Sequence, residues 1–491
     1  METSLLIIIL GLITYFIVSR GVSKITTTPW WMLWLVLMTP AISLGLWTLV
    51  YGERRPMPTI LLLGLFIFSP LSYWFLVQAG RRNPPREDSG TIAPQAIPLD
   101  NQTPPLRPIT KEEEVKLRDC FPWGIYYLQG VDYFPQAMVC RGKLRTDPDR
   151  AYQAVNHNIQ TLFGDRFYTI FQETSKGFPV FTLVPNPHAQ NHAQNPELRS
   201  PTFRPFLALG LLLATLLSTT AIGTNLAGFS VKQIQSSPGF LMQGLPYALA
   251  LMAIVIIHEL GTYFASVYYQ MHTTLPYFIP VPFFPGTIGA FRQLRSPAPH
   301  RKAMFDTGLA GPVAGLIITL PLLFWGLAHS TVVPLGATSS LISVESLNPR
   351  FSLLLTLISK LALGGKFIAG QGIQLHPLAI AAYIGLIILA FNLIPLGQLN
   401  GGHLVHAMFG QKKAVAIGQM TRLIFLFLAF LQPDLLLAAV LFLFMPVSDQ
   451  PALNDVSELN NWRDITGLVI LGFLVMMIVP VPKAIIQWLS I

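Results

Sequence analysis

Charged side chains are scarce in this sequence of 491 residues. Asp, Glu, Lys and Arg make up 11% of it, against about 25% in an average soluble protein, while 52% of the residues are hydrophobic. A mean hydropathy of +0.53 excludes a water-soluble domain of this size. Acidic residues are the scarcer sign, with 23 Asp and Glu against 32 Lys and Arg. Because no Lys/Arg-rich tract with interleaved aromatic residues occurs, we expect no nucleic-acid partner, and the positive excess is typical of the cytoplasmic loops of membrane proteins.

Cysteine is nearly absent. The only two, Cys120 and Cys140, exclude a disulfide framework and a Cys-rich metal site. Both lie in the polar part of the chain and are interpreted as core thiols, with a redox pair between them as the alternative.

Long apolar runs dominate what remains, and a membrane-spanning helix needs about 20 such residues. The sequence predicts a polytopic α-helical membrane protein of about eight to ten spans. The runs lie near 4–18, 31–50, 58–78, 205–226, 245–270, 304–328, 376–395, 414–431, 433–446 and 465–482. Basic clusters after the third and fifth runs and before the eighth place those loops on the cytoplasmic side, and the first run is expected to be a retained span.

A polar insert separates the third and fourth runs. We expect N-terminal spans over 1–82, a Pro-rich linker over 83–109, a small soluble α+β domain over 110–185, a second linker over 186–202 and a transmembrane core over 203–491. Within the insert, Thr110-Lys-Glu-Glu113 predicts a capping box, and strands are expected at 125–127, 137–140, 167–171 and 180–184. A helix capped by Asp147 and closed by Gly164 should place Ala151, Val155, Ile159 and Leu162 on one face. The orientation of the spans puts this insert on the cytoplasmic side.

The string Ile257-His258-Glu259-Leu260-Gly261-Thr262 lies inside the apolar run 245–270. Ionisable residues within a membrane span are expensive to bury and therefore indicate a functional site. The zinc-protease motif H-E-x-x-H places two histidines on one helix face with a Glu as general base, and Thr262 stands where its second histidine belongs. On this string alone, a hydrogen-bonded polar pair in a helix bundle is the better interpretation.

Three further strings change that judgement. The stretch 275–286, LPYFIPVPFFPG, holds four prolines and cannot form a helix, so we expect a membrane-embedded hairpin whose edge pairs with an extended substrate strand. Small residues at 310–315 allow close helix contact. Finally Asn392-Leu-Ile-Pro395 is followed by Leu399-Asn400-Gly401 at the end of an apolar run.

Taken in order, these strings resemble the site-2 protease family of intramembrane zinc metalloproteases, most of all its plastid and cyanobacterial branch. Gly142-Lys-Leu-Arg145 is similar to the G-N-L-R motif of that branch. The resemblance implies a zinc site in which H-E-x-x-H supplies two ligands and the general base, a later N-x-x-P-x-x-x-L-D-G string supplies an Asp ligand, and activated water cleaves a transmembrane helix of a substrate protein. It also implies a cyanobacterial-type inner or thylakoid membrane, or a plastid membrane, as the location.

Carried over residue by residue, the resemblance implies an incomplete site. His258 matches the first ligand, Glu259 the general base, and Asn392 with Pro395 the N-x-x-P element. Thr262 and Asn400 replace the other two ligands with neutral oxygens that zinc disfavours, so zinc is expected to be absent or weakly bound. Three further histidines, at 272, 300 and 376, are expected at the surface or as helix caps, and His403 is a weak alternative ligand.

Three hypotheses stay open from the sequence. The first is a pseudoprotease that keeps the fold and binds or regulates membrane protein partners within the bilayer. The second is an active metalloendopeptidase with an unusual zinc site. The third is a transporter or channel, which the absence of internal repeats and of several intramembrane charges disfavours.

Overall fold

The structure is a computed structural model. It describes residues 28–52, single positions between 58 and 76, and residues 109–134, 137–174, 177–186, 205–229, 233, 236–282, 284–334, 352–364, 371–431, 435–482 and 484–485. The chain divides into two compact units, Met1–Thr103 with Arg422–Phe444, and Pro104–Thr421 with Met445–Ile491. The expected span 4–18 and the two linkers, apart from residues 109 and 186, lie outside the described residues, as does most of the expected span 58–78.

The first unit is helical. It contains α2 (Trp30–Tyr51), α15 (Leu436–Phe444) and the last part of α14 (Gln411–Leu431). Ser69 Oγ donates a hydrogen bond of 2.8 Å to the carbonyl of Val36, which joins α2 to the segment that follows it. Phe425 and Phe442 pack edge to face, with ring centroids 4.8 Å apart.

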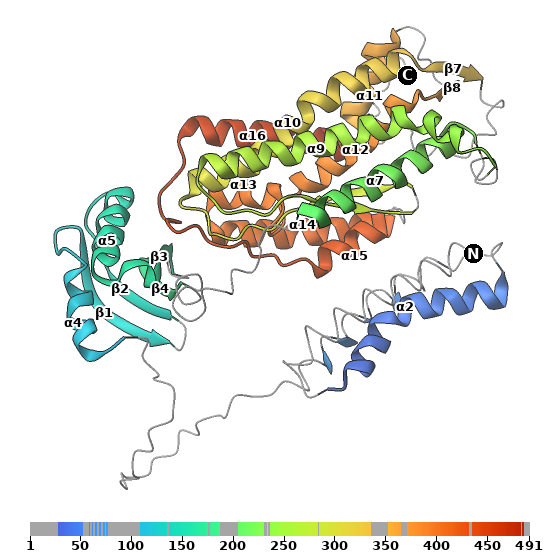
Figure 1. Ribbon diagram of the computed structural model, residues 1–491. Coiled ribbons are helices and arrows are strands. Elements are labelled where there is room, and N and C mark those ends of the chain that lie inside the picture. The colour runs from blue at the N-terminus through green and yellow to red at the C-terminus, as the bar shows by residue number, and fades with distance from the viewer. Residues whose placement is uncertain are drawn as a thin grey trace. The chain divides into compact units, whose positions relative to one another are not determined.

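The second unit contains a four-stranded antiparallel sheet with helices, which we call the sheet module (residues 109–186; Figure 1). Its elements are α4 (Lys111–Asp119), β1 (Tyr126–Phe134), β2 (Ala137–Leu144), α5 (Pro148–Phe163), the short η1 (Gly164–Arg166), β3 (Phe167–Glu173) and β4 (Pro179–Pro185), and the strand order is β1-β2-β4-β3.

The local signals in this module have the expected effects. Thr110 and Glu113 form the reciprocal capping box that starts α4, and Asp147 caps α5. All four strands form, and β1 and β2 run longer than expected. Ala151, Val155 and Ile159 are fully buried, whereas Leu162, in the last turn of α5, is 48% exposed.

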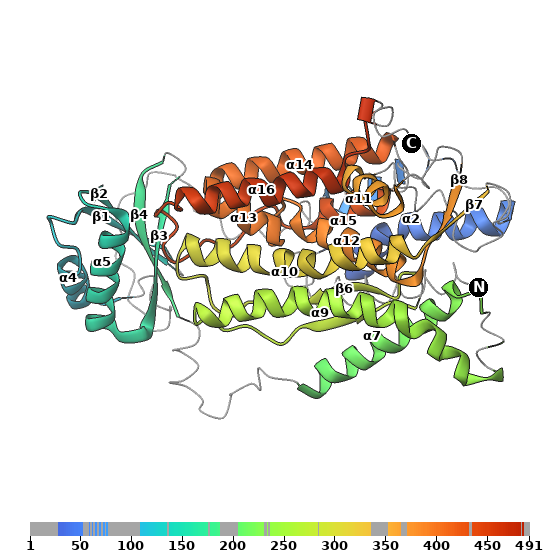
Figure 2. The same ribbon diagram turned by 90° about the horizontal axis from the view of Figure 1, so that it is seen from above.

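The remaining helices of the second unit form a bundle. They are α7 (Pro205–Leu226), η2 (Pro238–Gly244), α9 (Leu245–Tyr268), α10 (Arg301–Ala328), α11 (Leu353–Leu363), α12 (Pro377–Leu393), α13 (Asn400–Phe409), the first half of α14 and α16 (Asn461–Ile478). α10 packs against α9, α12 and α13, and both views show it alongside them (Figures 1 and 2). His300 and His376 cap α10 and α12 through their ring nitrogens, as predicted.

The contact between α9 and α10 is unusually close because it is made by glycines. A Cβ atom on Gly261 would lie 2.7 Å from the carbonyl oxygen of Ala310, and one on Gly311 would lie 2.2 Å from Thr262 Oγ1. The small residues at 310–315 therefore bring α10 directly against the part of α9 that carries the polar pair.

Two short antiparallel strand pairs lie between the helices. β5 (Tyr277–Pro280) pairs antiparallel with β6 (Thr287–Phe291), and β7 (Thr331–Pro334) pairs with β8 (Gln371–Gln374). The described residues of the Pro-rich stretch, 275–282 and 284–286, are therefore non-helical, as its prolines require. α7 packs along β5, and Ser218 Oγ donates a hydrogen bond of 2.8 Å to the carbonyl of Gly286.

Five described helices are long and apolar enough to cross a membrane. They lie at Trp30–Trp47, Pro205–Leu226, Gly239–Tyr268, Arg301–Ala328 and Asn461–Ile478. α11 and α12 are shorter apolar helices. The chain is thus a polytopic helical membrane protein, with five of the ten expected spans represented by helices of full length.

The segment Leu453–Asp455 joins the sheet module to the helical bundle. The amide of Phe171 in β3 donates to the carbonyl of Leu453 at 2.7 Å, and the amide of Asp455 donates to the carbonyl of Phe171 at 2.8 Å. On its other side, the amide of Leu453 donates to the carbonyl of Ala298, just before α10. Asn454 adds a side-chain hydrogen bond of 2.9 Å to Asp149 in α5.

Candidate functional site

The polar pair of α9 faces the protein interior. The side chains of His258, Glu259 and Thr262, all on α9, are buried. Most of the other residues of this helix are apolar. This is the arrangement predicted from the cost of placing ionisable groups in lipid.

Both ring nitrogens of His258 have partners. Nδ1 lies 3.2 Å from Glu259 Oε1, and Nε2 lies 3.2 Å from Asn400 Nδ2. The tautomer that carries its proton on Nδ1 satisfies both contacts, since Nδ1–H donates to the carboxylate and the lone pair of Nε2 accepts from the Asn400 amide. Glu259, His258 and Asn400 therefore form one closed hydrogen-bond chain.

Asn400 reaches His258 because the helical conformation is interrupted between α12 and α13, where the chain turns. Asn392 lies in the last turn of α12, where its Nδ2 donates to the carbonyl of Ile388 at 2.9 Å. Pro395 is half-buried in the turn that follows, and Asn400 is the first residue of α13. The prediction that Asn400 lies close to His258 is confirmed.

Thr262 takes no part in the chain formed by the other three. Its Oγ1 donates back to the carbonyl of His258 at 3.3 Å, and Gly311 leaves the space that this hydroxyl occupies. A larger side chain at 262 would have to turn away from Gly311 and towards the cavity.

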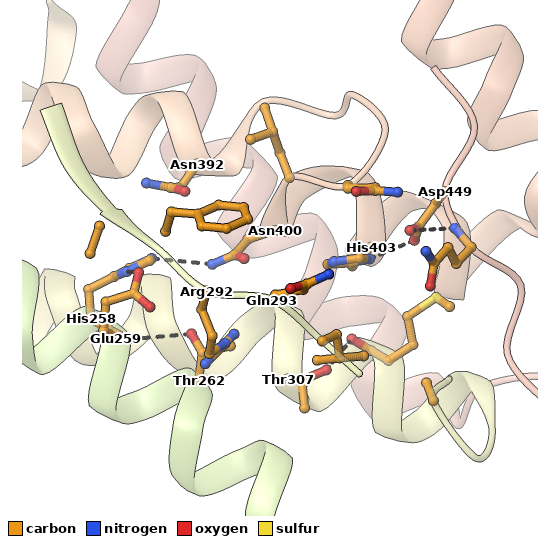
Figure 3. A pocket seen from close by; sticks show the side chains of 18 of the residues that line it. His258, Glu259, Thr262, Arg292, Gln293, Thr307, Asn392, Asn400, His403 and Asp449 are labelled. Atoms are coloured by element: carbon orange, nitrogen blue, oxygen red, sulfur yellow. Dashed lines mark hydrogen bonds and ion pairs between the residues drawn. The ribbon is translucent and has the colours of Figure 1, made fainter. Parts of the chain in front are cut away.

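These residues line a cavity of about 440 Å³ (Figure 3). Its wall on one side is the end of β6 and the residues after it, and its floor comes from α9, α10 and α13. The polar and charged lining residues are His258, Glu259, Thr262, Arg292, Gln293, Thr307, Asn392, Gln398, Asn400, His403, Asp449 and Gln450. Of the six residues that the family motifs assign to the site, Pro395 is the one that does not line the cavity.

A second buried chain, which the sequence did not indicate, runs from the cavity to the sheet module. His403 Nδ1 lies 2.6 Å from Asp449 Oδ2, which also lies 3.3 Å from His406 Nδ1. His406 Nε2 lies 3.2 Å from Asp455 Oδ2, in the segment that pairs with β3. His406 is completely buried, and each of its ring nitrogens faces a carboxylate. Both nitrogens can donate a hydrogen bond only when the ring is protonated, so this arrangement favours a charged His406 between the two carboxylates.

Asp449 lies in the loop between α15 and α16, outside the candidate spans. Burial alone would raise the pKa of this carboxyl, but the charge of His403 and the hydrogen bonds from His403 and His406 outweigh it and lower the pKa to about 2. Asp449 is therefore an anion at any physiological pH. The scarcity of acidic residues in the last third of the chain is the signal that could have drawn attention to it.

The donor set does not fit a catalytic zinc ion. Such a site needs three protein ligands, from imidazole, thiolate or carboxylate, and an open position for water. Here the lone pair of His258 Nε2 is used by Asn400, Thr262 is turned to the backbone, and Asn400 offers a neutral amide. Across the part of the chain that the structure describes, no group of three His, Cys, Asp or Glu side chains is placed to hold a metal ion.

The fold and the cavity define a class: a helical membrane protein with a His-Glu pair buried at mid-helix beside a non-helical hairpin. Comparisons with known proteins agree. The model of peptidase family M50 matches residues 246–431, and the model of the EGY3 middle domain matches residues 115–191.

Curated plant proteins match as well. The probable zinc metalloprotease EGY1, chloroplastic, of Oryza sativa subsp. japonica is 35% identical over 243 residues, which are 49% of this chain and 41% of the relative. Its counterpart in Arabidopsis thaliana is 35% identical over 49% of this chain and 44% of the relative. The probable zinc metalloprotease EGY2, chloroplastic, of Oryza sativa subsp. indica is 26% identical over 74% of this chain and 65% of the relative.

The chain belongs to the site-2 protease family, peptidase family M50, in the branch that includes these plastid proteins. It spans less than half the length of the first two relatives. No solved structure matches it significantly.

Proposed function

We propose that this chain is a pseudoprotease: it keeps the membrane fold of the site-2 proteases, does not hydrolyse peptide bonds, and binds segments of membrane protein partners. One observation carries the proposal. His258, the single retained ligand position, has both ring nitrogens engaged within the protein, by Glu259 and Asn400. A closed chain of this kind is stable without a metal ion.

The roles of the other residues follow from the same geometry. Glu259 would be the general base of an active enzyme, but here it accepts a hydrogen bond from His258, and without a bound metal ion it would have no metal-activated water to deprotonate. Thr262 and Asn400 occupy the two ligand positions that are lost. Asn392 and Pro395 end α12 and allow the turn that brings Asn400 to His258.

The partner-binding part of the proposal rests on the hairpin. Residues 290–294, at the end of β6 and just after it, line the cavity, and β5 is covered by α7. An extended segment of a membrane protein that adds to β6 would therefore lie across the cavity, with its backbone paired to the hairpin. We propose that the hairpin lies within the membrane, as a lining of the cavity beside the span α9.

We also propose where the molecule resides and how it is oriented. The relatives are named chloroplastic, and we infer a plastid membrane or the corresponding cyanobacterial membrane. The sheet module is proposed as a soluble insert on the cytoplasmic side, because the basic residues Arg301 and Lys302 begin α10 at the end of the bundle that this module contacts through Lys302 and Asp149, 3.5 Å apart.

The test is to rebuild the ligand set. Thr262→His places a second imidazole one helical turn from His258, and Asn400→Asp replaces the donor at His258 Nε2 with a carboxylate that favours a cation between them. We expect the purified double variant to bind zinc in a ratio of one per chain. The matched control is Thr262→His with Asn392→Asp, which adds the same groups to the same cavity but leaves the hydrogen bond of Asn400 intact, and it should bind none.

Activity is measured on the unmodified protein. In liposomes with a transmembrane-helix peptide, the wild type and Glu259→Gln should both leave the peptide intact. Cleavage by the wild type that is lost in Glu259→Gln would contradict the proposal and would identify an active metalloendopeptidase with an unusual metal site.

A further inference from the structure

Arg292 lies in the cavity wall directly after β6, in the same cavity as His258, Glu259 and Asn400 (Figure 3). Its Nη1 is buried and has no hydrogen-bond partner among the residues the structure describes. Leaving a buried donor unpaired is costly, and more so for a charged group, so its position requires an explanation.

The explanation is electrostatic. Burial lowers the pKa of the Arg292 guanidinium, and the negative charge of Glu259, which lines the same cavity, offsets part of that effect. The other carboxylate of the cavity, Asp449, is already paired with His403. The guanidinium of Arg292 is thus the cation that faces Glu259, and an arginine keeps its charge at every physiological pH.

We propose that Arg292 is the resident cation of this cavity and that its charge excludes divalent metal ions, separately from the loss of ligands at 262 and 400. The inference rests on the proposed metal-free function and deepens it. In a metal site of this kind, the positive charge beside the general base is supplied by the ion. Here the protein supplies it, and a divalent cation entering the cavity meets a fixed charge of the same sign in a partly buried, weakly screened environment.

Two causes of weak metal binding can therefore be separated: the ligands lost at 262 and 400, and the charge of Arg292. Restoring the ligands alone leaves Arg292 in place, so the rebuilt site should bind zinc weakly. Removing the charge of Arg292 as well should strengthen binding, although Arg292 supplies no ligand and its replacement adds none.

The experiment compares zinc affinity, measured by competition with a chromogenic chelator, in the Thr262→His/Asn400→Asp protein with and without a third change. Arg292→Met removes the charge and keeps much of the length of the side chain. We expect it to lower the dissociation constant for zinc at least tenfold relative to the double variant. Arg292→Lys keeps the charge and should leave the affinity within a factor of three of the double variant. Arg295→Met, three residues further along the same segment and outside the cavity lining, is the control for a general loss of positive charge.

The outcomes are distinct from those that test the proposed function. Equal zinc affinity with and without the Arg292→Met change, or a gain with Arg292→Lys as large as with Arg292→Met, would overturn the inference while leaving the pseudoprotease proposal standing. Should the double variant not fold, the same three replacements are compared in the Asn400→Asp background with the same expected ranking. Zinc in the unmodified protein would instead overturn the proposed function itself.

Discussion

His406 is the residue whose replacement should destabilise the core most clearly. Its side chain is fully buried, and its two nitrogens face Asp449 and Asp455, which are 4% and 5% exposed. His406→Ala leaves two buried carboxylates with only His403, at the edge of the cavity, as a cation for one of them. Removing one partner of a buried ion pair costs about 3–5 kcal/mol, a large fraction of a typical stability of about 5–15 kcal/mol.

The thermal midpoint of the purified protein in detergent measures this effect. At about 2–4 °C per kcal/mol for a unit of this size, the expected loss is roughly 6–20 °C. His406→Ala/Asp455→Ala should recover part of it, because the second change removes one of the two uncompensated charges. His272→Ala is the control, since that side chain is exposed and should shift the midpoint by less than about 2 °C. A His406→Ala protein as stable as this control would refute the buried charge chain.

Three further predictions follow from the same structure. The pKa of the Asp449 carboxyl is lowered from 3.8 to about 2, so the stability that its ionised form gives the folded protein, about 2 kcal/mol, is complete above pH 4 and is lost as the pH falls towards 2. The acid-induced fall in thermal midpoint should therefore be smaller in Asp449→Asn than in the wild type, and equal falls would contradict the pairing. Burial and the charge of Asp119 raise the pKa of the Cys120 thiol to about 11, and burial with neighbouring groups raises that of Cys140 to about 12. Alkylation of these thiols at pH 8 should therefore be about a hundredfold slower in the folded than in the denatured protein, and equal rates would show that the thiols are accessible. Asn454→Ala should speed hydrogen exchange at the amides of residues 171 and 455, which join the sheet module to the bundle, and unchanged protection would mean that the backbone contacts suffice without this side chain.

The parts of the site that could be predicted are those that local pattern determines. His258 and Glu259 stand together inside an apolar run, so their burial follows from the cost of exposing them to lipid. The helix break between Asn392 and Asn400 follows from Pro395 and the glycines after it. The capping box at Thr110 is likewise a local hydrogen-bond pattern, and it forms as expected.

The parts that could not be predicted depend on contacts between distant segments. His406 and Asp455 are 49 residues apart, and no periodicity connects a helix residue to a loop residue at that separation. Arg292 reads in the sequence as one of several basic loop residues, and only the fold turns it into the cavity. The exposure of Leu162 has the same origin, because periodicity assigns a helix face but not how far along the helix a neighbour covers it.

The zinc content of the unmodified, purified protein, determined by elemental analysis after equilibration with a low concentration of free zinc, tests the central claim most directly. Both ring nitrogens of His258 are hydrogen-bonded, to Glu259 and to Asn400, and the other two ligand positions hold neutral side chains. We therefore predict a zinc content far below one per chain and equal to that of a His258→Ala control. One tightly bound zinc per chain that disappears in the control would contradict the account.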